Sequence, residues 1–280
     1  MKRRLMLAAV LCMALVAVMA WSAAPAGAIT YGVPDNGEHP GVGQVVVGLE
    51  GPDGFTAPGG SGTLIAPGVF LTAGHIADFI SEYGLDFWVN FDPVYDPGAL
   101  GGQSRWLTGT IICNPAYQPH ANDRGDLAVI VLDDPEGITE DIEPARLPPV
   151  GYLDDLAASG TLQGETFTCV GYGLHERLHS ATGKPDYTGW DDFGRWQAVS
   201  SFLALTEFWV HMSQNPALCD GGTCFADSGG PYFLSDPATG KDVLVATTVR
   251  GDHVCRASAI NYRLDTPEAR DFLEHYVTLP

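Results

Sequence analysis

The sequence is poor in positive charge: 14 Lys and Arg residues stand against 34 Asp and Glu residues, a formal net charge of −20 at pH 7. Lys2, Arg3 and Arg4 open the chain, and only two lysines follow, Lys184 and Lys241. Nucleic acids and anionic membranes are bound largely through such side chains. The scarcity argues against both as partners. We interpret the acidic excess chiefly as a source of solubility, with attraction of cationic substrates as the alternative.

Apolar runs long enough to cross a membrane are also missing. The stretch from Leu5 to about Ala20 has about 16 residues, whereas a spanning helix needs about 20. It follows the three basic residues at the start and precedes Ala26-Gly27-Ala28, an A-x-A cleavage pattern. Residues 1–28 are therefore predicted to be a secretory signal that is removed. We expect a secreted protein without membrane attachment, and a membrane anchor is the weaker alternative.

Cysteines are few, and the number left after signal removal is odd. An exported chain can keep disulfides, but an odd number leaves at least one thiol unpaired. The five are Cys113, Cys169, Cys219, Cys224 and Cys255. The sequence also lacks internal repeats, low-complexity tracts and an acidic calcium-loop pattern. We expect no metal and no cofactor.

Alternation of strands with helices is absent as well. From Gly43 onward, short apolar segments are separated by Gly, Pro and Asp, which predicts an all-β barrel or sandwich. The expected strands are 44–47, 63–66, 69–72, 87–91, 110–112, 127–132, 166–171, 198–205, 208–211, 243–249 and 259–264. Residues 133–150 are predicted to cross between two halves. A helix is expected near the C-terminus, where Thr266 can cap it and Pro267 suits its first position.

Three stretches carry residue types that suit nucleophilic catalysis. Ser228 lies in Cys-Phe-Ala-Asp-Ser-Gly-Gly-Pro (224–231), where glycines allow a tight turn whose N–H groups can face a negative charge. His75 ends Leu-Thr-Ala-Gly-His (71–75), and Asp126 opens the apolar run up to residue 132. A polar turn without catalytic role is the alternative for the serine stretch.

Together these stretches resemble the chymotrypsin/trypsin-like serine peptidases, in which the order is likewise His, Asp, Ser. The resemblance implies an all-β fold of two six-stranded antiparallel barrels with a C-terminal helix. Residues 29–150 would form the barrel that carries His75 and Asp126, and residues 151–280 the barrel that carries Ser228. It also implies a monomeric serine endopeptidase that hydrolyses proteins or peptides through an acyl-enzyme, with Ser228 as nucleophile, His75 as base and Asp126 orienting the base.

Ala226 departs from the family, which has glycine there. The resemblance assigns the backbone N–H groups of Ala226 and Ser228 to the oxyanion hole. If the turn requires a positive φ, alanine strains it, and loss of one donor typically costs about 10²–10³ in turnover. The alternative is that the loop tolerates alanine. A catalytically weak or inactive binding protein on the same fold is therefore the second hypothesis.

The resemblance also implies a specificity pocket, a disulfide and an activation device. Gly222 corresponds to the pocket base and Gly251 to its wall, which disfavours cleavage after Lys or Arg and weakly favours a large apolar or aromatic side chain. Cys224 and Cys255 match a bridged pair of the family. Ile76 stands where a second bridge usually begins, so that bridge is missing, and Arg250 replaces a tryptophan beside the cleft.

The activation device concerns the new amino terminus. Signal removal after Ala28 exposes Ile29, whose ammonium group would insert into the second barrel and pair with Asp227. A frayed end at Ile29 is the alternative. A nucleophile elbow of an α/β-hydrolase, suggested by Ala226-x-Ser228-x-Gly230, is disfavoured because only 52 residues follow Ser228.

Overall fold

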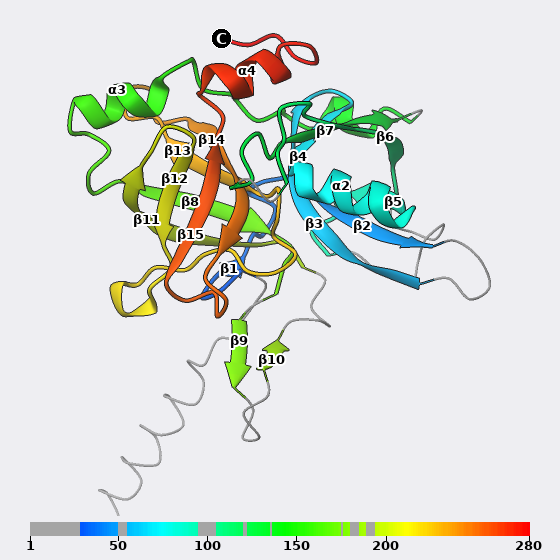
Figure 1. The fold of residues 1–280 in the computed structure, drawn as a ribbon, viewed down its shortest axis with the longest axis horizontal. Coiled ribbons are helices and arrows are strands. Elements are labelled where there is room, and N and C mark those ends of the chain that lie inside the picture. Colours follow the sequence, from blue (N-terminus) through cyan, green and yellow to red (C-terminus); the bar gives the residue numbers. More distant parts are fainter. Residues whose placement is uncertain are drawn as a thin grey trace, which may run out of the picture.

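The computed structural model describes residues 29–49, 55–94, 105–119, 122–134, 136–174, 176–179, 185–188 and 194–280. The predicted signal, residues 1–28, lies outside the described residues, as do residues 175, 180–184 and 189–193. Figure 1 shows two β-structures side by side, with a helix at the C-terminal end packed above them. In the described part of the chain, no helix is both long and apolar enough to span a membrane.

The first β-structure is a six-stranded antiparallel sheet in the order β5-β2-β3-β4-β7-β6. Its strands are β2 (Val42–Leu49), β3 (Phe55–Ala66), β4 (Val69–Thr72), β5 (Asp86–Asn90), β6 (Thr108–Cys113) and β7 (Ala128–Asp133). The edges approach each other through one bridge, in which Val89 and Leu107 exchange N–H···O bonds of 2.8 and 2.9 Å. The sheet thus curls around an apolar interior that contains Val45, Leu64 and Phe70.

The second β-structure is a closed six-stranded barrel. The order of the sheet is β1-β11-β12-β15-β14-β13-β8, and β11 also pairs with β8, which closes it. Its strands are β8 (Thr166–Gly171), β11 (Trp196–Leu205), β12 (Trp209–Ser213), β13 (Pro231–Ser235), β14 (Asp242–Gly251) and β15 (Ser258–Arg263). The short β1 (Val33–Pro34) pairs with β11, so the start of the described chain lies against this barrel.

The remaining elements cover and connect the two β-structures. They are α2 (Gly74–Tyr83), α3 (Tyr152–Ala158), α4 (Pro267–Leu273), the 3-10 turns η1 (Ile138–Asp141) and η2 (Pro216–Leu218), and the hairpin of β9 (Glu176–His179) and β10 (Pro185–Thr188). The predicted C-terminal helix is confirmed: Thr266 Oγ1 accepts from Ala269 N at 3.2 Å, and Pro267 is the first helical residue. The fold is mostly β and chymotrypsin-like, as expected.

A buried arginine joins the N-terminal segment to the first sheet. Arg195 Nε donates to Asp35 Oδ2 at 2.8 Å, while Nη1 donates to the carbonyls of Val42 and Phe91 at 3.0 and 3.1 Å. Burial raises the pKa of Asp35, but hydrogen bonds from His39 and Arg195 and the arginine's charge outweigh this and lower the pKa to about 2. The ion pair therefore holds the segment after residue 29 in one position.

Candidate active site

His75 and Asp126 are joined by two hydrogen bonds. The backbone N–H of His75, in the first turn of α2, donates to Asp126 Oδ1 at 2.7 Å, and Nδ1 lies 2.8 Å from Asp126 Oδ2. A side chain at Gly74 would begin only 3.1 Å from the same carboxylate, so this close approach suits glycine. With Nδ1 bound to the carboxylate, Nε2 is the ring nitrogen left to accept a proton.

The surroundings of His75 favour its protonated form. Burial lowers the pKa of His75, but the hydrogen bond and charge of Asp126, with a contribution from Asp123, outweigh burial and raise the pKa above its usual value. Asp126 is fully buried, whereas a third of the His75 side chain is exposed. The imidazole is thus oriented from the protein side and accessible from the solvent side.

The loop of Ser228 packs against the residues that lead to His75. Ser228 O accepts from Ser61 N at 2.8 Å. Gly229 has φ +79°, and a side chain there would begin 2.2 Å from Thr72 Oγ1 and 2.7 Å from Ala73 N. Only glycine allows this contact, which brings the serine loop beside the histidine turn. Among the described residues no hydrogen bond links Ser228 Oγ to the imidazole, a bond that often tightens only when substrate is bound.

Ala226 occupies a backbone position that favours glycine. Asp227 N donates to Cys224 O at 3.2 Å, and φ of Ala226 is +68°, which is the third position of a type II turn. An L-residue there costs about 1–2 kcal/mol. The strained turn that the sequence raised as a possibility is therefore present.

A hydrogen bond determines which way the strained peptide faces. Leu174 N donates to Phe225 O at 2.7 Å. Because C=O and N–H point in opposite directions across a trans peptide, the N–H of Ala226 points away from Leu174. A flip of this peptide would break that bond.

Asp227 is buried beneath the serine loop without a cationic partner in the described part of the chain. Its oxygens accept from Gly173 N and Cys224 N, both at 2.8 Å. Burial raises the pKa of Asp227 to about 7, against the lowering effect of these two amides. Ile29 is also fully buried, with φ +66°, and the next residue, Thr30, exchanges N–H···O bonds of 2.8 and 3.0 Å with Gly222.

A cavity of about 270 Å³ adjoins Ser228. Its lining includes Thr223, Ala226, Ser228, Gly251 and Asp252, together with Cys224, Phe225, Thr248, Val249, Arg250, His253 and Cys255. Of the two glycines expected in the specificity pocket, Gly251 lines this cavity and Gly222 lies behind it, next to Thr30.

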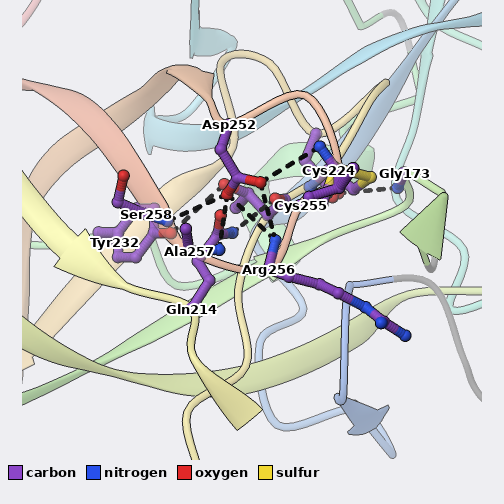
Figure 2. The surroundings of a disulfide bond; sticks show 12 residues. Gly173, Gln214, Cys224, Tyr232, Asp252, Cys255, Arg256, Ala257 and Ser258 are labelled. Carbon is purple, nitrogen blue, oxygen red and sulfur yellow. Dashed lines mark hydrogen bonds between the residues drawn. A yellow bond between two sulfur atoms is a disulfide. The ribbon is translucent and has the colours of Figure 1, made fainter.

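The predicted disulfide between Cys224 and Cys255 is present, with the Cα atoms 5.3 Å apart. Asp252 holds the loop around it: its carboxylate accepts from the backbone N–H of Val254, Arg256, Ala257 and Ser258. Figure 2 shows Asp252 over this loop, with the bridge beside it. Burial raises the pKa of Asp252, but these amides outweigh it and the pKa is lowered. Among the described cysteines, Cys113, Cys169 and Cys219 remain free.

The sequence missed three contributors to this site. Ile76 packs against β3, since a side chain at Gly60 would begin 2.2 Å from Ile76 Cδ1. Leu174 orients the Ala226 peptide, and Gln214 lies behind the cavity. Nothing near these residues in the sequence marks them, because each contact forms only when the chain folds.

Within the described ranges, no group of three or more His, Cys, Asp and Glu side chains is placed to hold a metal ion. No curated protein matches the sequence. A family model described as Trypsin matches residues 37–260, which include His75, Asp126 and Ser228. The chain belongs to the trypsin family.

Proposed function

We propose that this serine peptidase-like protein is an active, secreted endopeptidase with His75, Asp126 and Ser228 as its catalytic triad. The observation that carries the proposal is the doubly hydrogen-bonded His75–Asp126 pair, with the glycine-packed serine loop beside it. Protein or peptide chains would be the substrates, and neither a metal nor a cofactor enters the reaction.

The reaction would follow from the roles of these side chains. His75 Nε2 takes the proton of Ser228 Oγ as the oxygen attacks the scissile carbonyl. Asp126 stabilises the imidazolium, and the N–H groups of Ala226 and Ser228 stabilise the oxyanion. His75 then protonates the departing amine, which leaves an acyl-enzyme at Ser228. A water molecule, deprotonated by His75, hydrolyses the ester and frees Ser228.

A catalytically weak binding protein is the second candidate, and the strain at Ala226 favours it. The Leu174–Phe225 hydrogen bond favours the enzyme, because it keeps the Ala226 N–H from turning toward Leu174. We regard the enzyme as the better-supported function.

The amino terminus would complete the site. Removal of residues 1–28 would create an ammonium group at Ile29, and Asp227 is a buried carboxylate that lacks a cation in the described structure. Their pairing would stabilise the serine loop from below. Export from the cell is part of this proposal, because signal removal would produce the active form.

The test uses the form that begins at Ile29 and a fluorophosphonate probe with a peptide substrate. Labelling of Ser228 and hydrolysis are expected. His75→Ala, Asp126→Asn and Ser228→Ala should each lower kcat/KM by several powers of ten. Absence of labelling and of hydrolysis in the unsubstituted protein would support the binding protein instead.

A further inference from the structure

Gln214 occupies the space that a side chain at residue 222 would fill. A Cβ atom at Gly222 would lie 2.3 Å from Gln214 Nε2 and 2.4 Å from its Cγ. Gln214 follows β12 directly, eight positions before Gly222 along the chain. The position that the resemblance assigns to the pocket base is thus filled by a side chain from another element.

The Gln214 amide is held firmly in this place. Nε2 donates to Thr223 O at 2.6 Å, and the backbone N–H donates to Ala257 O at 3.0 Å. Figure 2 shows Gln214 beside Ala257, below the loop that carries the disulfide. Its Oε1 would be 3.5 Å from a Cβ atom at Gly251, a residue that lines the cavity. The amide therefore contacts Thr223 and lies close to Gly251, two residues that line the cavity.

Gln214 lies behind the cavity, because Thr223 and Gly251 belong to its lining and Gln214 and Gly222 do not. Gln214 is fully buried, and within the described ranges its Oε1 has no hydrogen-bond partner. A side chain that enters past Ser228 would meet the Thr223–Gly251 end of the cavity before it reached residue 222.

The carboxylate that lines the cavity is already engaged by backbone amides. Asp252 Oδ1 accepts from Arg256, Ala257 and Ser258, and Oδ2 accepts from Val254 and Arg256. Arg250 also lines the cavity and is paired with Asp123 at 2.6 Å. Among the described residues of the lining, lysine or arginine would therefore find no carboxylate with a free oxygen.

We infer that Gln214 determines specificity by filling the deep end of the pocket, so that the enzyme prefers short, uncharged side chains before the scissile bond. The inference rests on the proposed peptidase function. It replaces the sequence-based preference for a large apolar or aromatic side chain.

The test compares peptide substrates that differ only in this residue: Ala, Val, Leu, Phe, Tyr, Lys and Arg. The unsubstituted protein should have a kcat/KM at least tenfold higher for Leu than for Phe, Tyr, Lys or Arg. Gln214→Ala opens the end of the cavity and should raise the Phe-to-Leu ratio of kcat/KM at least tenfold. Gln214→Leu keeps the volume and should retain the preference for Leu. Equal or better cleavage after Phe in the unsubstituted protein would overturn the inference, as would loss of the preference in Gln214→Leu.

Binding of product peptides tests this inference independently of catalysis. It also remains informative if a variant folds poorly, because folding is measured alongside. In Ser228→Ala, calorimetry with product peptides that end in Leu or Phe should give tighter binding for Leu. Adding Gln214→Ala should reduce that difference at least tenfold, with thermal unfolding as the folding control. If this binding pattern is found but the unsubstituted protein hydrolyses no substrate, the proposed peptidase function is wrong and the inference about Gln214 still holds. Binding that ignores Gln214, or no measurable binding, would overturn the inference.

Discussion

At the scale of single residues, the charge around His75 should determine the acid limb of the pH–rate profile. Because the pKa of His75 is raised by Asp126 and Asp123, kcat/KM should rise with pH and reach half its plateau above pH 6.5. Asp123→Asn removes one negative charge and leaves Arg250, now unpaired, nearby. The midpoint should then move to lower pH, as measured with a peptide substrate.

Asp133→Asn is the matched control, because it also removes one negative charge but from the far end of β7. It should leave the midpoint unchanged. Equal shifts in both variants would show that Asp123 acts only through the net charge.

The backbone strain at Ala226 gives a second prediction for a single residue. Ala226→Gly should raise the free energy of unfolding by about 1 kcal/mol, because glycine adopts φ +68° without strain. Turnover should rise less than tenfold, since the Leu174–Phe225 bond already directs the Ala226 N–H. Chemical denaturation and steady-state kinetics check the two parts.

Ala238→Gly, in a surface turn where φ of the alanine is not positive, should bring no gain in stability and is the control. A hundredfold rise in the turnover of Ala226→Gly would contradict the orientation argument. It would mean that the alanine had withheld a whole oxyanion donor.

At the scale of the elements, the packing of α2 on β3 should stabilise the His75 turn in place of the disulfide that the family usually has there. Ile76 is 2% exposed and covers Gly60, whose neighbour Ser61 binds Ser228 O. Ile76→Ala should lower the free energy of unfolding by about 2–5 kcal/mol. It should also reduce kcat/KM, because the cavity would loosen both catalytic loops.

Ile65→Ala provides the comparison, since Ile65 is also a buried isoleucine but belongs to the end of β3, four positions after Ser61. It should lower stability with a much smaller change in kcat/KM. Equal loss of activity in both variants would show that Ile76 contributes only to general stability and does not support the catalytic loops specifically.

At the scale of the whole molecule, the state of the amino terminus should change how stability depends on pH. With residues ahead of Ile29 still attached, Asp227 has a raised pKa of about 7. The unfolded carboxyl titrates near 3.9, so the folded form loses stability as pH rises from about 4 to 7. The free energy of unfolding falls by about 4 kcal/mol in total over this range.

The form that begins at Ile29 should escape this loss. A paired ammonium group would stabilise the Asp227 carboxylate and have its own pKa raised, so the pair persists to about pH 8 and weakens as pH climbs through that raised value. Thermal unfolding should give similar stabilities near pH 4 for this form and for one that begins at Gly27. At pH 7.5 the form that begins at Ile29 should be more stable by several kcal/mol.

Asp227→Asn should abolish the difference between the two forms. Activity should follow the same order, with the form that begins at Gly27 slower at neutral pH. If the two forms unfold alike at pH 7.5 and hydrolyse substrate equally fast, insertion of the amino terminus is wrong.

The sequence by itself determined the features that depend on short stretches. The strand 69–72 and the strand 166–171 agree with β4 and β8, and the cap at Thr266 was marked by its own neighbours. The pairing of Cys224 with Cys255 followed from the resemblance. Local chemistry suffices for these because capping, alternation and turn residues act within a few positions.

Tertiary structure decided the rest, because the partners are distant in sequence. The sequence did not predict α2, α3 or β13. These short segments gain stability from contacts with other elements, α2 with β6 and β7, α3 with β11, and β13 with β8 and β14. Nor could the sequence show that Ile76 covers Gly60, or that Leu174 directs the peptide of Ala226. That Gln214 fills the place of residue 222 depended on β12 and the serine loop meeting in space, which no local pattern encodes.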